Sequence, residues 1–378
     1  MAPPGSHPTL TPAPSSPTGG PGFSSARHAG SRGLDGGGGL GGGVASGAGG
    51  GVLAGLGRAG VAEARRLAPL YLYRAGAQVA RALPGSLGIA AAEAVGVAAG
   101  RLTTGRRAMI TRHLSRIAAS SAGPTGSGVS PVSAVSSGSA ASARSARSSV
   151  SSADVDRAFA SYGRYWLESF RLAHLDGAGL EAGMSYEGIG YLEEARALGR
   201  GVIMGMPHLG AWDWGGAWLS ASGFPLTVVA EALEPVELFE WFAGWRRQLG
   251  MTVVPLDRAA GSAVMAALRR GEVAGLLCDR DLTGDGVEVS FFGERTRLPG
   301  GPATLALRTG APLLPCCVLF DGQQHRGIVR PPLDTSRQGG LREDVQRVTQ
   351  DLADALAALI RLAPDQWHVF TPNWPSDG

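Results

Sequence analysis

The regular alternation of apolar runs and amphipathic segments over residues 200–320 constrains this chain more than any other feature. Five short runs lack a polar side, namely GVIMGMP, FPLTVVAE, MTVVPL, EVAGLLCD and APLLPCCVLF. Segments with helical spacing separate these runs, and a longer helical segment, LREDVQRVTQDLADALAALIRLAP, follows them. Strands that are apolar on both sides are typical of parallel sheets covered by helices. We therefore expect an α/β fold with a mostly parallel central sheet covered by helices.

Two stretches of low complexity divide the chain. Residues 1–57 are rich in Gly and Pro, and residues 119–153 are rich in Ser and Ala. Neither stretch can bury enough apolar surface to offset the entropy lost on ordering, so both are expected to be disordered. The folded part then consists of N-terminal amphipathic helices over 58–118, packed with an α/β domain over 154–378.

The N-terminal helical segment carries many arginines, in a chain that has no lysine. They include Arg65, Arg66, Arg74, Arg81, Arg106, Arg107 and Arg112. Arg with Tyr and Leu on amphipathic helices suits an anionic bilayer surface, although ordinary solvated helix faces explain the pattern equally well. A net charge of +3 is too mild to indicate a nucleic-acid partner. No run reaches the roughly 18 uncharged apolar residues of a spanning helix, so any membrane contact is expected to be peripheral.

The cysteines do not form a metal-binding pattern. Cys278, Cys316 and Cys317 show neither CxxC spacing nor a Cys/His set, and two of them stand in an apolar run. We expect buried thiols in a reducing compartment and no metal.

The segment PHLGAWDWGG places a histidine and an aspartate five positions apart at the end of the first predicted strand. Five residues of a regular helix turn through about 500°, which would leave the two side chains about 140° apart. Pro207 and Gly210 break the chain there, so Asp213 falls in the first helical turn and His208 in the preceding loop. The aspartate could then fix the imidazole tautomer and leave the other ring nitrogen as a base. The alternative is that both are polar residues at the edge of a core.

Charged residues also follow the strand EVAGLLCD. Asp279, Arg280 and Asp281 stand at its carboxyl end, where open parallel sheets bind ligands. Farther along, the pair FF is flanked by Glu288, Arg295 and Arg297. Charged groups beside an apolar patch suit a donor with a phosphorylated head and a fatty tail, and an ordinary surface hairpin is the alternative. Glu231, which ends FPLTVVAE, either orients a polyol or caps the next helix.

Taken together, these motifs resemble one family. The segments HLGAWD, VAEALEP, DRDL, GVEVSFFGERTRLPGGPATLALRTGAPLLP and the ending WHVFTPNWPSD are similar to the bacterial lipid A biosynthesis acyltransferase family, within the lysophospholipid-acyltransferase-like superfamily. The resemblance is strong over about 154–374, weaker over 59–118, and absent from the low-complexity stretches. Within the family it points to the branch that acylates phosphatidylinositol mannosides.

The resemblance implies a glycerolipid-acyltransferase-like fold with membrane-contacting N-terminal helices. It implies transfer of a long-chain acyl group, typically palmitoyl, from acyl-CoA to a mannose hydroxyl, with no cofactor. His208 would be the general base, Asp213 its charge partner, and Glu288 a glutamate that supports the histidine. Glu231 would match an acceptor-site carboxylate, and Arg280 an arginine near the head group. The family is peripheral on the cytoplasmic face of the plasma membrane.

Further substrate contacts are expected from arginines and aromatic residues. Arg295 and Arg297 are expected to meet the substrate head. The acyl chain is expected to lie among Trp212, Trp214, Trp218, Phe291 and Phe292, with plain core packing as the alternative for some of them. The partners would be acyl-CoA, a membrane glycolipid and an anionic membrane surface. The alternatives are a lipid A precursor as acceptor, a thioester hydrolase, and a lipid-binding scaffold that retains the fold.

Overall fold

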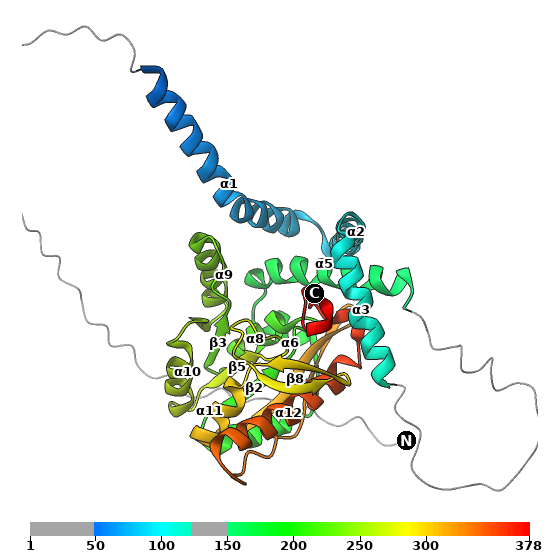
Figure 1. The fold of residues 1–378 in the computed structure, drawn as a ribbon, viewed down its shortest axis with the longest axis vertical. Coiled ribbons are helices and arrows are strands. Elements are labelled where there is room, and N and C mark those ends of the chain that lie inside the picture. The colour runs from blue at the N-terminus through cyan, green and yellow to red at the C-terminus, as the bar shows by residue number, and fades with distance from the viewer. Residues whose placement is uncertain (1–48, 122–149) are drawn as a thin grey trace, which may run out of the picture. The chain divides into compact units, whose positions relative to one another are not determined.

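The structure is a computed structural model that describes residues 49–121 and 150–378. The chain divides into two compact units, Met1–Pro69 and Leu70–Gly378. Of the first unit, the structure describes the part of helix α1 (Gly49–Ala82) that precedes Leu70. The other helices and strands belong to the second unit. Figure 1 labels them where there is room.

The helices predicted for the N-terminal segment are confirmed. They are α1, α2 (Gly85–Leu102) and α3 (Thr104–Ser121). Helix α1 begins inside the stretch 1–57 that was expected to be disordered, and residues 1–48 and 122–149 lie outside the described residues. In the part of the chain that the structure describes, no helix combines the length and apolar character needed to cross a bilayer.

Helix α2 packs closely along α5 (Ser152–Arg171) through small residues. Added Cβ atoms at Gly96 and Gly163 would each lie 2.2 Å from a backbone oxygen of the facing helix, so the two backbones meet where side chains are missing. A capping box between Ser151 and Asp154 fixes the start of α5. This helix therefore ties the N-terminal helices to the sheet domain.

A seven-stranded sheet in the order β1-β9-β8-β2-β5-β3-β4 forms the centre of the second unit. The strands are β1 (Met184–Glu187), β2 (Val202–Met206), β3 (Leu226–Ala230), β4 (Met251–Pro255), β5 (Val273–Leu277), β8 (Leu313–Asp321) and β9 (Gln324–Val329). The five strands predicted from the sequence are β2, β3, β4, β5 and β8, and they run parallel. Strand β9 returns antiparallel to β8, and β1 pairs with β9 in parallel. The expected mostly parallel sheet is confirmed.

Helices cover both faces of this sheet (Figure 1). They are α6 (Gly177–Ala182), α7 (Ile189–Ala197), α8 (Trp212–Ala221), α9 (Val236–Gln248), α10 (Ala260–Arg269), α11 (Gly301–Thr309) and α12 (Leu341–Ile360), with 3₁₀ turns at Leu172–His174, Pro364–Gln366 and Pro375–Asp377. Ile203 of β2 packs in the core that includes α10, α11 and α12, whereas Val202 and Met204 pack in the core that includes α8. Strand alternation thus gives each face its own apolar core.

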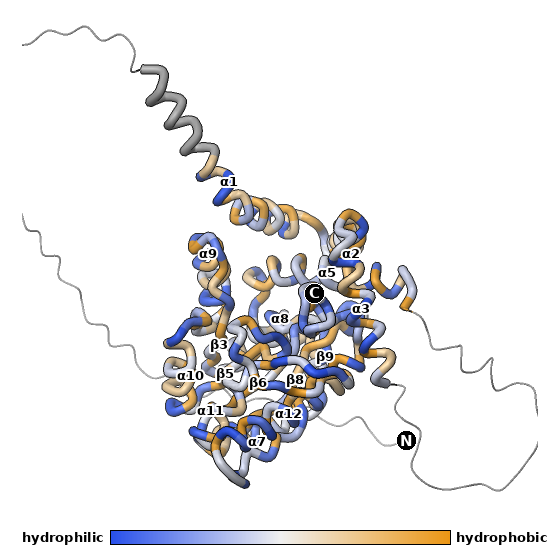
Figure 2. Tube along the Cα trace, in the orientation of Figure 1, coloured by the Kyte–Doolittle hydropathy of each residue, from blue (hydrophilic) through white to orange (hydrophobic). Residues whose placement is uncertain are grey.

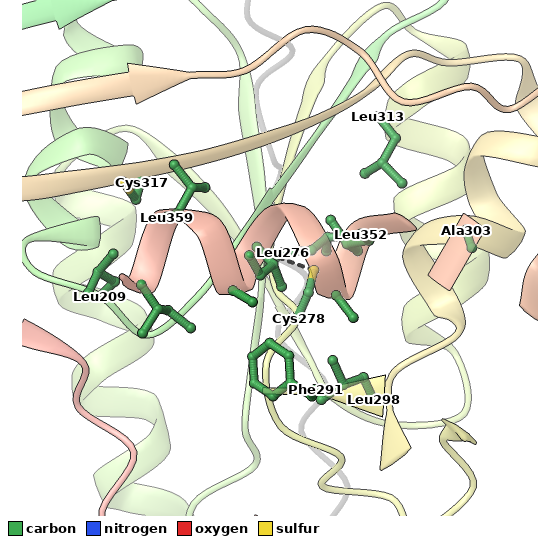
Figure 3. Packing of buried hydrophobic residues seen from close by; sticks show 14 of the residues in the cluster. Leu209, Leu276, Cys278, Phe291, Leu298, Ala303, Leu313, Cys317, Leu352 and Leu359 are labelled. Carbon is green, nitrogen blue, oxygen red and sulfur yellow. Dashed lines mark hydrogen bonds between the residues drawn. The ribbon is translucent and has the colours of Figure 1, made fainter. Parts of the chain in front are cut away.

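The FF pair belongs to a two-stranded hairpin, β6 (Val287–Phe291) and β7 (Glu294–Leu298). Phe291 is buried with Leu276 and Leu298 in the core beneath α12 (Figure 3). Glu288, Arg295 and Arg297 lie on the exposed side of the hairpin, whereas Glu294 is half-buried and pairs with Arg116 at 2.6 Å. The hairpin reading is therefore confirmed for this segment.

Candidate active site

Two neighbouring strands place His208 beside Asp279. Met206, which ends β2, lies opposite Leu277, which ends β5. His208 and Asp279 each follow these residues by two positions, at the same edge of the sheet. The histidine Nδ1 lies 2.6 Å from Asp279 Oδ1, and the His208 backbone N–H donates to Asp279 Oδ2 at 2.8 Å. One carboxylate therefore holds both the imidazole ring and the loop that carries it.

Asp279 is fully buried and stays ionised. Burial alone would raise the pKa of this carboxyl, but the charge of His208 and hydrogen bonds from His208 and Trp367 outweigh burial and hold the pKa below its ordinary value. The Trp367 Nε1–H donates to Asp279 Oδ2 at 2.7 Å. Because the carboxylate only accepts, Nδ1 of His208 must donate, and in the neutral ring this leaves a lone pair on Nε2. Nε2 has no hydrogen-bond partner among the described residues, so it is free to act as a base.

The C-terminal segment clamps the loop that carries His208. The His368 backbone N–H donates to the His208 carbonyl at 2.7 Å, and the Gly210 N–H donates to the Gln366 carbonyl at 2.9 Å. Gly210 has φ +63°, and a Cβ there would lie 2.1 Å from the Val318 carbonyl oxygen, so only glycine fits. Gln366 and the ending WHVF that follows it thus fix the loop that carries His208.

The expected contact between His208 and Asp213 is wrong. Asp213 does lie in the first turn of α8, but its buried carboxylate accepts from the Tyr165 hydroxyl at 2.7 Å and from Arg246 Nε at 2.9 Å and Nη2 at 3.1 Å. Burial alone would lower the pKa of Arg246, but the Asp213 carboxylate outweighs it and raises that pKa. Asp213 is therefore part of a buried ion pair between α8 and α9, and Asp279 supplies the partner of His208.

A cavity of about 560 Å³ is lined by His208 and Asp213, among other residues. Among the predicted residues, its wall includes His208, Asp213, Trp212, Glu231 and Arg280. Most of the remaining wall is apolar, with Met184, Ile189, Met204, Leu226, Phe239 and Val318 among its members. A mostly apolar cavity of this size with a few polar groups is typical of a site for a long apolar ligand.

Glu288 does not lie in this cavity wall. Its side chain is 57% exposed on β6 and pairs with Arg295 of β7, which is 84% exposed, at 3.1 Å. Arg297 is exposed on the same hairpin. The expectation that Glu288 supports the histidine is therefore wrong, because Asp279 makes that contact and Glu288 faces solvent. Arg295 and Arg297 likewise lie apart from the cavity lining.

The aromatic residues divide between the cavity and the cores. Trp212 and Trp218 line the cavity. Trp214 instead stacks on His325 with ring centroids 3.9 Å apart, while Phe291 and Phe292 pack in the core. Plain core packing, the stated alternative, thus holds for these three.

The described residues offer no site for a metal ion. Over 49–121 and 150–378, no group of three or more His, Cys, Asp or Glu side chains could hold one. The cysteines are free and buried, as expected. Burial is the main cause that raises the pKa of each thiol, to about 12 for Cys317.

Comparison with known proteins points to acyl transfer. The family described as bacterial lipid A biosynthesis acyltransferase matches residues 149–376, which include His208, Asp279, Trp367 and His368. A phosphatidylinositol mannoside acyltransferase of Mycolicibacterium smegmatis is 42% identical over 228 residues, covering 59% of this chain and 73% of that protein. A protein of the same name from Mycobacterium tuberculosis (strain H37Rv) is 41% identical over 222 residues, covering 57% of this chain and 69% of that protein.

Proposed function

The chain belongs to the bacterial lipid A biosynthesis acyltransferase family, and from this premise we propose that it moves a long-chain fatty acyl group, such as palmitoyl, from acyl-CoA to a mannose hydroxyl of a phosphatidylinositol mannoside. The observation that carries the proposal is His208 on the wall of a mostly apolar cavity, with the ionised Asp279 bound to its Nδ1 from behind that wall. The names of the similar proteins support the acceptor.

His208 acts as the general base. The acceptor oxygen bonds to the thioester carbonyl carbon while its proton passes to Nε2 of His208, and the carbonyl electron pair moves onto oxygen. When the carbonyl re-forms, the carbon–sulfur bond breaks, and the thiolate takes the proton from His208. The products are an ester and free CoA, and Asp279 stabilises the imidazolium between the two steps.

Glu231 and Arg280 are the polar groups that meet the substrates. Both line the cavity, at the carboxyl ends of β3 and β5, and neither has an ion-pair partner among the described residues. A carboxylate suits the hydroxyls of a sugar, and a guanidinium suits a phosphate. Glu231 therefore binds the mannose, and Arg280 binds a phosphate of the donor or acceptor.

The enzyme docks peripherally on the cytoplasmic face of the plasma membrane, where its lipid acceptor resides. Large apolar side chains are exposed on two helices, namely Tyr71, Leu72 and Val79 of α1 and Leu87, Val95 and Leu102 of α2. Figure 2 shows apolar residues along both helices. An exposed apolar helix face of this kind supports shallow insertion between lipids.

A reconstituted assay tests the proposal. Purified full-length protein is incubated with palmitoyl-CoA and a phosphatidylinositol mannoside, a lipid A precursor, or no acceptor, and the products are identified by mass spectrometry. The expected result is a new ester on the mannoside with stoichiometric release of CoA. Acylation of the lipid A precursor alone, or full-rate loss of the thioester without acceptor, would overturn the proposed acceptor or the transferase activity, respectively.

A further inference from the structure

A second histidine lines the cavity with one ring nitrogen unpartnered. His368 is 8% exposed and belongs to the cavity wall. Its ring lies among Tyr162, Tyr165 and Trp212, with centroid distances of 5.4, 5.5 and 5.6 Å. Nε2 lies 2.9 Å from Ser161 Oγ, whereas the buried Nδ1 has no hydrogen-bond partner. Buried polar atoms normally have partners, so an exception inside a ligand cavity points to a partner that the ligand supplies.

The surroundings of His368 keep its ring neutral and favour one of its two tautomers. Burial, together with nearby His208, lowers the pKa of His368 to about 3, so the ring is neutral at neutral pH. Among the described residues, the one hydrogen bond of the Ser161 hydroxyl is with Nε2 of His368. If that hydroxyl donates to Nε2, its proton is satisfied and the ring proton lies on Nδ1. The opposite tautomer would leave the hydroxyl proton without an acceptor among the described residues.

A donor N–H in this position matches the charge that develops during acyl transfer. As the acceptor oxygen adds to the thioester, the carbonyl oxygen becomes negative and needs a fixed donor in a site that excludes water. Two other donors near the cavity already have acceptors, since Arg246 donates to Asp213 and His208 Nδ1 donates to Asp279. His368 lies next to the base, since its backbone N–H donates to the His208 carbonyl at 2.7 Å.

We propose that the Nδ1–H of His368 donates a hydrogen bond to the carbonyl oxygen of the acyl donor and to the oxyanion that this oxygen becomes. His368 is then a catalytic residue, and Ser161 is a positioning residue that holds its tautomer. The assignment rests on the proposed acyl transfer. It predicts a hydrogen bond that strengthens in the transition state, so its loss lowers kcat more than it changes KM.

Two amide substitutions separate the functions of the two ring nitrogens. The amide nitrogen of Asn takes about the place of Nδ1, and that of Gln takes about the place of Nε2. His368→Gln therefore keeps the contact with Ser161 but removes the donor to the carbonyl, and we expect kcat to fall by about 10²–10³. His368→Asn keeps that donor and is expected to stay within about tenfold of wild type. Ser161→Ala is expected to lose less than His368→Gln, because the ring remains and only its preferred tautomer changes.

A binding measurement tests the same contact without turnover. Two unreactive analogues of palmitoyl-CoA are compared, a ketone in which a methylene replaces the sulfur and a thioether that lacks the carbonyl oxygen. One hydrogen bond favours the ketone by about 2- to 10-fold in Kd in the wild type. The ratio should fall toward one in His368→Gln and persist in His368→Asn. Circular dichroism and unfolding midpoints of both variants confirm that each is folded.

The outcomes distinguish this assignment from the proposed function. Full activity of His368→Gln, equal losses in both variants, or an unchanged ketone-to-thioether ratio would overturn the role of His368 while acyl transfer stands. A wild-type protein that forms no ester would overturn the proposed function, and the analogue ratios would still decide whether His368 contacts the carbonyl oxygen.

Discussion

His208 and Asp279 are joined by two hydrogen bonds across 71 positions of sequence, one from the ring and one from the backbone. A carboxylate that binds both groups fixes the loop as well as the tautomer. His208→Ala should lower turnover by about 10²–10⁴, the usual cost of losing a positioned base. Asp279→Asn should cost a similar factor, because an amide accepts from only one of its two atoms and favours the wrong tautomer. Steady-state kinetics with palmitoyl-CoA and the mannoside acceptor measure both effects.

Circular dichroism and unfolding midpoints serve as controls for these two variants. His208 lies on the cavity wall with its side chain 19% exposed, so its truncation should leave the fold intact. An Asp279→Asn enzyme that keeps more than about a tenth of wild-type turnover would show that the carboxylate does not orient the base.

The buried pair of Asp213 and Arg246 is expected to contribute mainly to stability. Asp213→Ala leaves a guanidinium that is 19% exposed without its carboxylate, and breaking a buried pair in this way costs about 3–5 kcal/mol. The double variant with Arg246→Met should recover much of that loss, because no unpaired charge remains. Urea unfolding measures both changes. If Asp213→Ala unfolds at the wild-type midpoint, the pair does not stabilise the fold.

Glu288 is expected to contribute neither to turnover nor to stability, in contrast to Asp279 and Asp213. Its partner Arg295 is 84% exposed, and such surface pairs contribute about 0–1 kcal/mol. Glu288→Gln should therefore leave both turnover and the unfolding midpoint close to wild type. A loss of turnover comparable to that of Asp279→Asn would restore Glu288 to the reaction and contradict the present assignment.

The contrast between Asp213 and Asp279 shows which features of the site could be predicted from the sequence and which could not. The strand runs and helices could be predicted, because each is specified by local periodicity and by Gly and Pro stops. The position of His208 at a strand end followed from the same pattern. The partner of His208, Asp279, could not be predicted in this way, because the order of strands in a sheet is set by long-range packing. Once β2 and β5 are neighbours with Met206 opposite Leu277, the residues that follow each strand must meet.

Buried neutral histidines make the fold sensitive to acid. Burial is the main cause that lowers the pKa of His368, to about 3, and that of His113. In the unfolded chain both titrate near 6.5, so below that pH the unfolded state binds more protons than the folded state. The contribution of the neutral histidines to the free energy of unfolding is complete above about pH 6.5. It is lost as the pH falls toward their pKa values in the folded protein, at up to about 1.4 kcal/mol per pH unit for each histidine.

Urea unfolding at several pH values between 7 and 4.5 measures this loss. His368→Asn should reduce the acid slope of the free energy of unfolding by up to about 1.4 kcal/mol per pH unit, because one of the two histidines with a lowered pKa is then absent. Parallel slopes for the variant and the wild type would show that His368 is already protonated in the folded protein.

Internal contacts of the N-terminal arginines change the expected mode of membrane binding. Arg107 pairs with Asp156 at 2.5 Å, and Arg112 donates to the Asp377 carbonyl at 2.6 Å, so both hold the fold together. Leu72 and Leu102, by contrast, are 73% and 86% exposed. Transfer of a Leu side chain out of water is worth up to about 1.5–3 kcal/mol, against about 1 kcal/mol for an Arg near an anionic surface. Insertion of apolar side chains should therefore dominate.

Liposome sedimentation separates the apolar and electrostatic contributions. Replacing Leu72, Leu87 and Leu102 with Ser should weaken binding to neutral and anionic vesicles alike, at low and at high salt. Replacing the exposed Arg74 and Arg81 with Gln should weaken binding to anionic vesicles only, and salt should remove the difference. Leu198, 53% exposed and outside these helices, supplies the control substitution to Ser. Binding that survives the three leucine substitutions, or that Leu198→Ser weakens equally, would contradict docking through α1 and α2.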